Sequence, residues 1–165
     1  MRSENLNYSH RKFLKSPSLE YQLGTYFPES LTLFPKTAPV SFKFLKEETT
    51  TGSILFFMSS NCAACDMKSI QEFVSKHPYF TYILFFDGNN EVLQFQPQSY
   101  ESGLQIYRCD FNKLQGQTHV NIVPYVLILN KIAQVVSAGI FNNYNKLELL
   151  AQPLIRVYTS ERSAK

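Results

Sequence analysis

The chain has 165 residues, enough for one domain with a full hydrophobic core. Hydrophobic residues make up 44% of the chain and charged residues 18%, which indicates a globular protein. The net charge of +3 is small, and no basic cluster interleaved with aromatic residues follows the amino-terminal head, so we expect no nucleic-acid partner.

The amino-terminal segment, residues 1–20, is rich in basic side chains and is predicted to be a flexible leader. The ordered domain is expected at residues 21–160. No apolar run approaches the length of a membrane span, so none is predicted. The first 25 residues also lack the apolar core of a secretory signal, and we therefore expect the protein in the cytoplasm.

Two short segments with period-two alternation, residues 31–34 and 40–44, predict an amino-terminal hairpin. Residues 53–58 are apolar without alternation, which predicts a central strand that is covered on both faces. A polar cluster at 59–61 is expected to cap a helix over 62–77, where apolar side chains recur at steps of three and four.

The remaining predicted elements alternate between strands and helices. In chain order they are a strand at 80–86, a short helix at 91–101, a strand at 104–109, a helical turn at 110–116, and two antiparallel strands at 124–129 and 132–138. Gly139 interrupts the last strand. Asn145 is expected to cap a final helix whose inner face carries Leu147, Leu150, Leu154 and Val157. This order predicts an α/β fold with a parallel core and an antiparallel edge.

The most informative motif is Cys62-Ala63-Ala64-Cys65, expected at a strand-to-helix turn. This spacing lets two sulfurs meet, as thiol–disulfide exchange requires. A helix amino end would stabilise a thiolate at Cys62 and lower its pKa below the free value of about 8.5. Cys65, one turn further along, would be more buried and would act as the resolving thiol.

The pair could instead be half of a zinc site, which needs four ligands. Only Cys109 and three scattered histidines could complete the set, so the pattern favours a dithiol without a metal or other cofactor. Cys109 is expected to be a buried small residue of a strand, with a second redox role as the alternative. His119 could approach the site, or be a loop histidine without chemistry.

Several segments resemble, in the right order, the thioredoxin superfamily and within it the TlpA/ResA-like (redoxin) group. They are a Gly-x-x-x-Pro lead-in at 24–28, the strand and motif at 54–65, the pair Val123-Pro124, and Gly139. The resemblance covers residues 21–158. It implies a thioredoxin-like α/β fold, with a central mixed sheet flanked by helices and an amino-terminal β-hairpin extension.

The resemblance also implies a cis bond between Val123 and Pro124 beside the dithiol. The Val123 backbone would then pair with an extended substrate, and Pro124 would place no N–H beside the sulfurs. A trans proline that opens an edge strand is the alternative. Substrate contacts are also expected from Ala63 and Ala64.

The sequence departs from thioredoxin at the site. Phe56 stands where thioredoxin keeps a buried aspartate, and the closest acid, Asp66, is expected to point to solvent. Ala63 and Ala64 add neither charge nor ring between the cysteines. We therefore expect a reduction potential between roughly −270 and −180 mV, the values of thioredoxin and disulfide isomerase.

These features predict a thiol–disulfide oxidoreductase that acts on a protein or peptide, such as a bacteriocin, and is recycled by an unidentified redox partner. Two alternatives stay open. Ser59-x-x-Cys62 matches the Thr/Ser-x-x-Cys of peroxiredoxins, although Leu55 replaces their proline and no arginine is evident nearby. The other alternative is a redox-inactive, peptide-binding thioredoxin-like module.

Overall fold

The computed structural model describes residues 23–46, 51–88 and 103–164. The predicted leader at 1–20 and the predicted helix at 91–101 lie outside the described residues. Within the described part, no helix combines the length and the apolar character that crossing a membrane requires.

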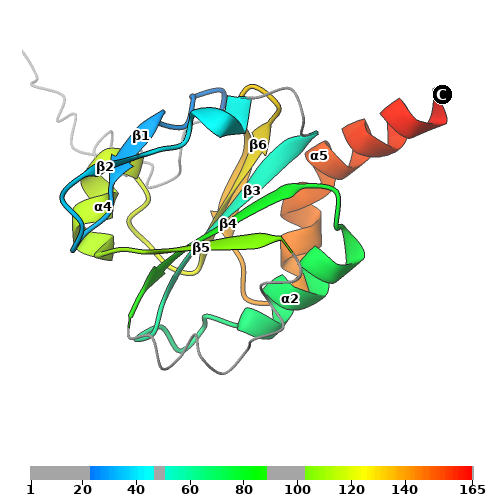
Figure 1. Ribbon diagram of the computed structural model, residues 1–165. Coiled ribbons are helices and arrows are strands. Elements are labelled where there is room, and N and C mark those ends of the chain that lie inside the picture. The colour runs from blue at the N-terminus through cyan, green and yellow to red at the C-terminus, as the bar shows by residue number, and fades with distance from the viewer. Residues whose placement is uncertain (1–22, 47–50, 89–102, 165) are drawn as a thin grey trace, which may run out of the picture.

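A five-stranded mixed sheet forms the centre of the molecule (Figure 1). Its strands are β3 (Gly52–Ser59), β4 (Thr81–Asp87), β5 (Leu104–Arg108), β6 (Tyr125–Asn130) and β7 (Val135–Ile140). Their order in space is β5-β4-β3-β6-β7. Strands β3, β4 and β5 are parallel, whereas β6 runs antiparallel to both β3 and β7. The apolar β3 is buried from Gly52 to Met58, as the lack of alternation predicted.

Helices α2 (Met67–Lys76) and α5 (Tyr144–Ser163) cover one face of the sheet (Figure 1). The opposite face carries a hairpin of β1 (Ser30–Thr32) and β2 (Pro39–Ser41), the short 3-10 helix η2 (Lys43–Lys46) and α4 (Phe111–Thr118). Successive side chains of a strand point to opposite faces. Phe56 and Met58 of β3 accordingly pack with the α2/α5 side, whereas Leu55 and Phe57 pack with the hairpin side.

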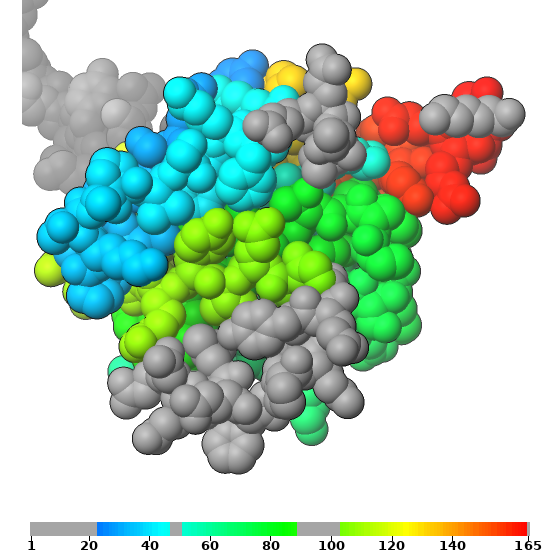
Figure 2. Space-filling view, viewed as in Figure 1, coloured from blue at the N-terminus to red at the C-terminus, as the bar shows by residue number. Residues whose placement is uncertain are grey.

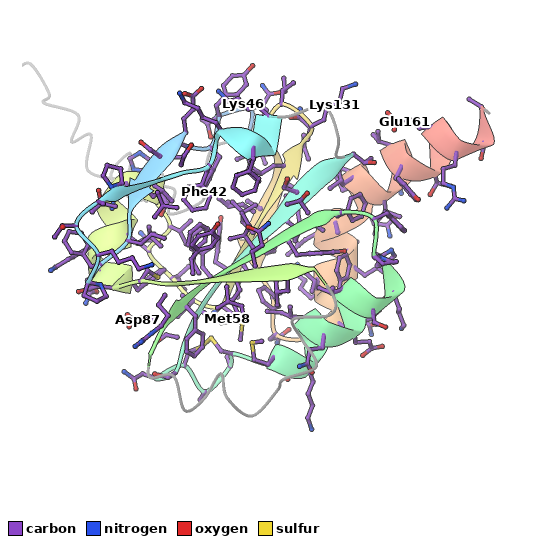
Figure 3. All side chains as sticks on the ribbon, viewed as in Figure 1. Phe42, Lys46, Met58, Asp87, Lys131 and Glu161 are labelled. Atoms are coloured by element: carbon purple, nitrogen blue, oxygen red, sulfur yellow. A yellow bond between two sulfur atoms is a disulfide. The ribbon has the colours of Figure 1, made fainter. Side chains whose placement is uncertain are left out.

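The hairpin is held on the sheet by aromatic packing. Phe42, labelled in Figure 3, is 1% exposed. Its ring centroid lies 5.6 Å from that of Phe85 and 5.1 Å from that of Tyr107. Burying one such side chain contributes about 1.5–3 kcal/mol. The hairpin extension thus belongs to the folded core.

The strand predicted at 40–44 is shorter than expected, because β2 ends at Ser41 and η2 follows. Phe42 and Leu45 are both buried and lie three residues apart. A 3-10 helix has three residues per turn, so residues at this spacing face the same side. Burial of both Phe42 and Leu45 on the same side therefore overrides the local alternation.

The strand predicted at 132–138 is displaced, since β7 starts at Val135 and continues through Gly139 to Ile140. The turn before it is longer than two residues and includes Ala133 with a φ of 61°. Gly139 pairs with Val126 inside the ladder. A Cβ atom at Gly139 would lie 3.1 Å from Leu150 of α5, so the glycine permits close helix packing instead of ending the strand.

The final helix is capped by Asn143 and not by Asn145: the Asn143 side chain accepts a hydrogen bond from the Lys146 backbone N–H at 2.8 Å. Leu147 and Leu154 are buried, as predicted. Val157 is 49% exposed, because the end of α5 extends past the sheet that would have covered it (Figures 1 and 2).

Candidate active site

The two motif cysteines lie in a turn segment between β3 and α2. The Cys62 N–H donates to the Ser59 carbonyl oxygen at 3.2 Å, and the Cys65 N–H donates to the Cys62 carbonyl oxygen at 3.2 Å. The Cα atoms of Cys62 and Cys65 are 5.3 Å apart and their sulfurs form a disulfide. Figure 3 shows this disulfide at the end of the sheet where Met58 is labelled.

The prediction of a helix starting at the motif is wrong, because α2 begins at Met67. Asp66 is its N-cap: one carboxylate oxygen accepts from the Lys68 backbone N–H at 3.0 Å, and the other accepts from the Ser69 hydroxyl at 2.7 Å. Asp66 therefore does not point freely into solvent, and the polar cluster at 59–61 does not cap this helix. A carboxylate cap satisfies free N–H groups and favours this starting point over an earlier one.

This start changes the electrostatics expected at the site. The positive end of α2 lies beside Cys65, and the carboxylate of Asp66 already occupies it. The influence of a helix dipole falls off within its first turn. The support of a Cys62 thiolate by helix N–H groups, expected from the sequence, is therefore not supplied by α2.

The motif residues differ in their surroundings. Ala63 and Ala64 are exposed, whereas Cys62 and Cys65 are half-buried. Cys65 packs against the core cluster on the α2/α5 side of the sheet. Cys62 is therefore flanked by an exposed, uncharged turn, and Cys65 is the cysteine in contact with the core.

Val123 and Pro124 lie at the same edge of the sheet as the motif. Tyr125, which follows them, pairs with Phe57 near the end of β3, so the approach to β6 and the exit from β3 are neighbours. The Val123–Pro124 peptide bond is cis. Pro124 is buried, and half-buried Val123 lies just outside the β3–β6 ladder.

The other neighbour of the motif is the end of β4, which no sequence motif marks. Asp87 pairs with Ser59, and its carbonyl oxygen accepts the Ser60 N–H at 2.8 Å. Gly88 touches the Ser60 side chain so closely that a Cβ atom would overlap with it. The Asp87 carboxylate accepts the Phe111 N–H at 3.0 Å and thus holds the start of α4.

Cys109 is a free thiol, 7% exposed, directly after β5. Burial raises its pKa to about 12, and the neighbouring carboxylates Asp87 and Asp110 act in the same direction. Its thiol is therefore a poor nucleophile near neutral pH. Exposed His119 forms the C-cap of α4 with a φ of 58°.

Phe56, at the position of the thioredoxin aspartate, is fully buried. It stacks on Tyr82, with ring centroids 6.3 Å apart, and meets the edge of Phe141 at 5.8 Å. The Phe56 side chain is therefore part of the hydrophobic core between the sheet and α5. Among the described residues, no group of three or more His, Cys, Asp and Glu side chains could hold a metal ion.

The mixed sheet, its covering helices and the CxxC turn beside a cis-proline define a thioredoxin-like fold. No protein-family model matches the sequence, and no curated protein matches it.

Solved structures with this fold include several named as disulfide oxidoreductases. A putative thiol:disulfide interchange protein DsbE from Chlorobium tepidum has a TM-score of 0.60 at 15% identity, covering 82% of this chain and 97% of that one. StoA from Bacillus subtilis has a TM-score of 0.53 at 16% identity, covering 77% and 99%. A secreted disulfide oxidoreductase from Mycobacterium tuberculosis has a TM-score of 0.52 at 13% identity, covering 75% and 94%.

Proposed function

We propose that the protein is a thiol–disulfide oxidoreductase that exchanges disulfides with a protein or peptide. The observation that carries this proposal is the Cys62–Cys65 disulfide in an accessible turn at the sheet edge. The names of the structural neighbours agree with it.

In the reducing direction, the Cys62 thiolate attacks one sulfur of a substrate disulfide. This forms a mixed disulfide and releases the other substrate sulfur as a thiolate. The Cys65 thiolate then attacks the Cys62 sulfur, which frees the second substrate thiol and closes the Cys62–Cys65 disulfide. Cys62 takes the attacking role because both of its chain neighbours, Asn61 and Ala63, are exposed, whereas Cys65 packs against the core.

The substrate is proposed to approach as an extended chain between the cysteine turn and the entry to β6. Val123 lies outside the ladder and is partly exposed, so its backbone can pair with such a chain. The small, uncharged side chains of Ala63 and Ala64 would let the substrate backbone come close to the cysteine turn. A particular peptide, such as a bacteriocin, is the proposed substrate class, and the cytoplasm stays the proposed location.

A Cys65→Ser variant tests this proposal in cell extract. Without the resolving thiol, mixed disulfides through Cys62 persist and can be identified by mass spectrometry after non-reducing gels. A matched Cys62→Ser variant should trap nothing, and Cys109→Ser should behave as the unchanged protein.

Two results would contradict the proposal. Absence of any trapped species together with no reduction of insulin disulfides would remove the oxidoreductase activity and favour a binding module. Rapid peroxide consumption that needs Cys62 but not Cys65 would favour a thiol peroxidase instead.

A further inference from the structure

An open, polar cavity of about 330 Å³ lies at the end of β4 and β5. Its walls come from the first turn of α4, the ends of the two strands and the segment after β1. The side chains that line it include Phe34, Pro35, Asp87, Arg108, Asp110 and Lys113. The volume is at the lower end of the range of small-molecule sites.

The cavity is lined by charges of both signs that do not neutralise one another directly. Among the residues that the structure describes, neither carboxylate forms an ion pair with Arg108 or Lys113. The Arg108 guanidinium donates to the Gly88 carbonyl oxygen at 2.9 Å, which uses one of its five N–H groups. The Lys113 ammonium lies 4.2 Å from the centre of the Phe34 ring. Both cations therefore keep donors for a ligand.

The two carboxylates also keep acceptor capacity. Asp87 accepts the Phe111 N–H, and Asp110 accepts the Lys113 N–H at 3.2 Å as the N-cap of α4. A carboxylate has about four acceptor positions, so each retains several for an ammonium group. The cavity thus offers both partners that a zwitterion requires.

The cavity lies close to the redox turn. Asp87 pairs with Ser59 on the adjacent strand, at a spacing of about 4.8 Å. A hydrogen-bonded turn joins Ser59 to Cys62, which keeps their Cα atoms within about 7 Å. Cys62 therefore lies within roughly 12 Å of Asp87, and an extended tripeptide spans about 10 Å.

We propose that this cavity binds a short peptide thiol that carries ammonium and carboxylate groups, and that this thiol recycles the disulfide. The inference rests on the proposed function, and the peptide thiol is the reductant of the Cys62–Cys65 disulfide. Arg108 and Lys113 receive carboxylates, Asp87 and Asp110 receive the ammonium, and the thiol reaches toward Cys62.

The redox step balances with two molecules of thiol. The first, as its thiolate, attacks a sulfur of the Cys62–Cys65 disulfide, forms a mixed disulfide and releases the other cysteine as a thiolate, which takes up a proton. The second attacks the ligand sulfur of the mixed disulfide. The products are the reduced protein dithiol and the disulfide of the peptide thiol.

The kinetic test measures how fast glutathione and uncharged 2-mercaptoethanol reduce the disulfide of the oxidised protein. Each rate is divided by the rate at which the same thiol reduces a small-molecule disulfide. We expect glutathione to be favoured. In the double variant Arg108→Gln/Lys113→Gln this preference should fall about fivefold, the effect of an exposed ion pair at the upper end of the usual range. The rate with 2-mercaptoethanol should not change.

A matched control removes two positive charges elsewhere, in Lys131→Gln/Arg156→Gln. Lys131 lies at the opposite end of the sheet from Asp87 (Figure 3), and Arg156 is exposed on α5. This variant should keep the preference. Equal losses in both double variants would assign the effect to net charge and would overturn the proposal, as would the absence of any preference.

Direct binding separates this inference from the proposed function. S-methylglutathione has no thiol and should bind saturably to the unchanged protein, and more weakly to the Arg108/Lys113 variant. No binding, with insulin reduction intact, would overturn the cavity's role but leave the oxidoreductase. Binding without insulin reduction would leave a peptide site and remove its redox role.

Discussion

Asp66 directly follows Cys65, and its carboxylate accepts a hydrogen bond from the Ser69 hydroxyl at 2.7 Å. The start of α2 and the redox turn are therefore adjacent, and one acidic side chain belongs to both. Its negative charge stabilises the helix N-terminus and disfavours a thiolate on the neighbouring cysteine.

Asp66→Asn should separate these two effects, because asparagine keeps the capping role but removes the charge. We expect a loss of stability of no more than about 0.3–1 kcal/mol, the contribution of the charge to the helix N-terminus. The reduction potential should become less negative by up to roughly 20 mV for an interaction of about 1 kcal/mol. Asp66→Ala should shift the potential similarly, and it should lower the free energy of unfolding by about 1 kcal/mol more than Asp66→Asn, because the cap is lost as well. Redox titration and urea unfolding measure both quantities, and an unchanged potential in Asp66→Asn would contradict the electrostatic argument.

Gly52 at the start of β3 should not tolerate a side chain. A Cβ atom there would lie 2.5 Å from both the Leu129 carbonyl oxygen and a methyl group of Leu154. Gly52→Ala should therefore lower the free energy of unfolding by about 1–3 kcal/mol. Gly116→Ala is the control, since its Cβ meets nothing within 4 Å inside α4, and it should raise stability by about 0.5–1 kcal/mol. A neutral Gly52→Ala in urea titrations would show that the strand and helix can separate at no cost.

His77 should make stability depend on pH. Its side chain is 13% exposed, with the Tyr79 hydroxyl 2.7 Å from Nδ1 and a Glu148 carboxylate oxygen 3.7 Å from Nε2. Burial lowers the pKa of His77 below about 6.5, and Glu148 opposes this shift only in part. The unfolded chain then binds the proton more readily, so stability is complete above about pH 6.5 and falls as the pH drops through the folded value.

The measurement is the free energy of unfolding at about pH 7.5 and about pH 5.5. His77→Gln should flatten the loss, and Glu148→Gln should steepen it, because Glu148 is the group that favours the charged imidazole. A His77→Gln variant with the full pH dependence would show that other groups cause it.

Cys109 should not react with thiol reagents in the native protein. Because burial raises its pKa to about 12, only two of the three cysteines of the reduced protein should react quickly with iodoacetamide at neutral pH. Mass spectrometry should show the third adduct only after unfolding in urea. Cys109→Ala should keep insulin reductase activity, and loss of that activity without loss of stability would point to a redox role for this thiol.

Much of the architecture could be predicted because its signals are local. The unbroken apolar run of β3 indicated a strand covered on both faces, and the step of Ile70, Phe73 and Val74 indicated a buried helix face. The places where prediction failed are those where a partner distant in sequence intervenes. Gly139 continues a strand because it pairs with Val126 of β6, and Leu150 leaves room there for a glycine only. Val157 is exposed because the sheet ends beneath α5.

The sequence by itself determined the CxxC spacing, the central strand before it and the proline that ends up beside it, since each depends on the order and type of neighbouring residues. Only the tertiary structure decided that the redox turn precedes its helix, and that Asp87, Arg108 and Lys113 surround one cavity next to it. Parallel pairing of β3, β4 and β5 brings together charges from separate parts of the chain. No local pattern encodes that meeting, because it depends on strand register and on the α4 cap.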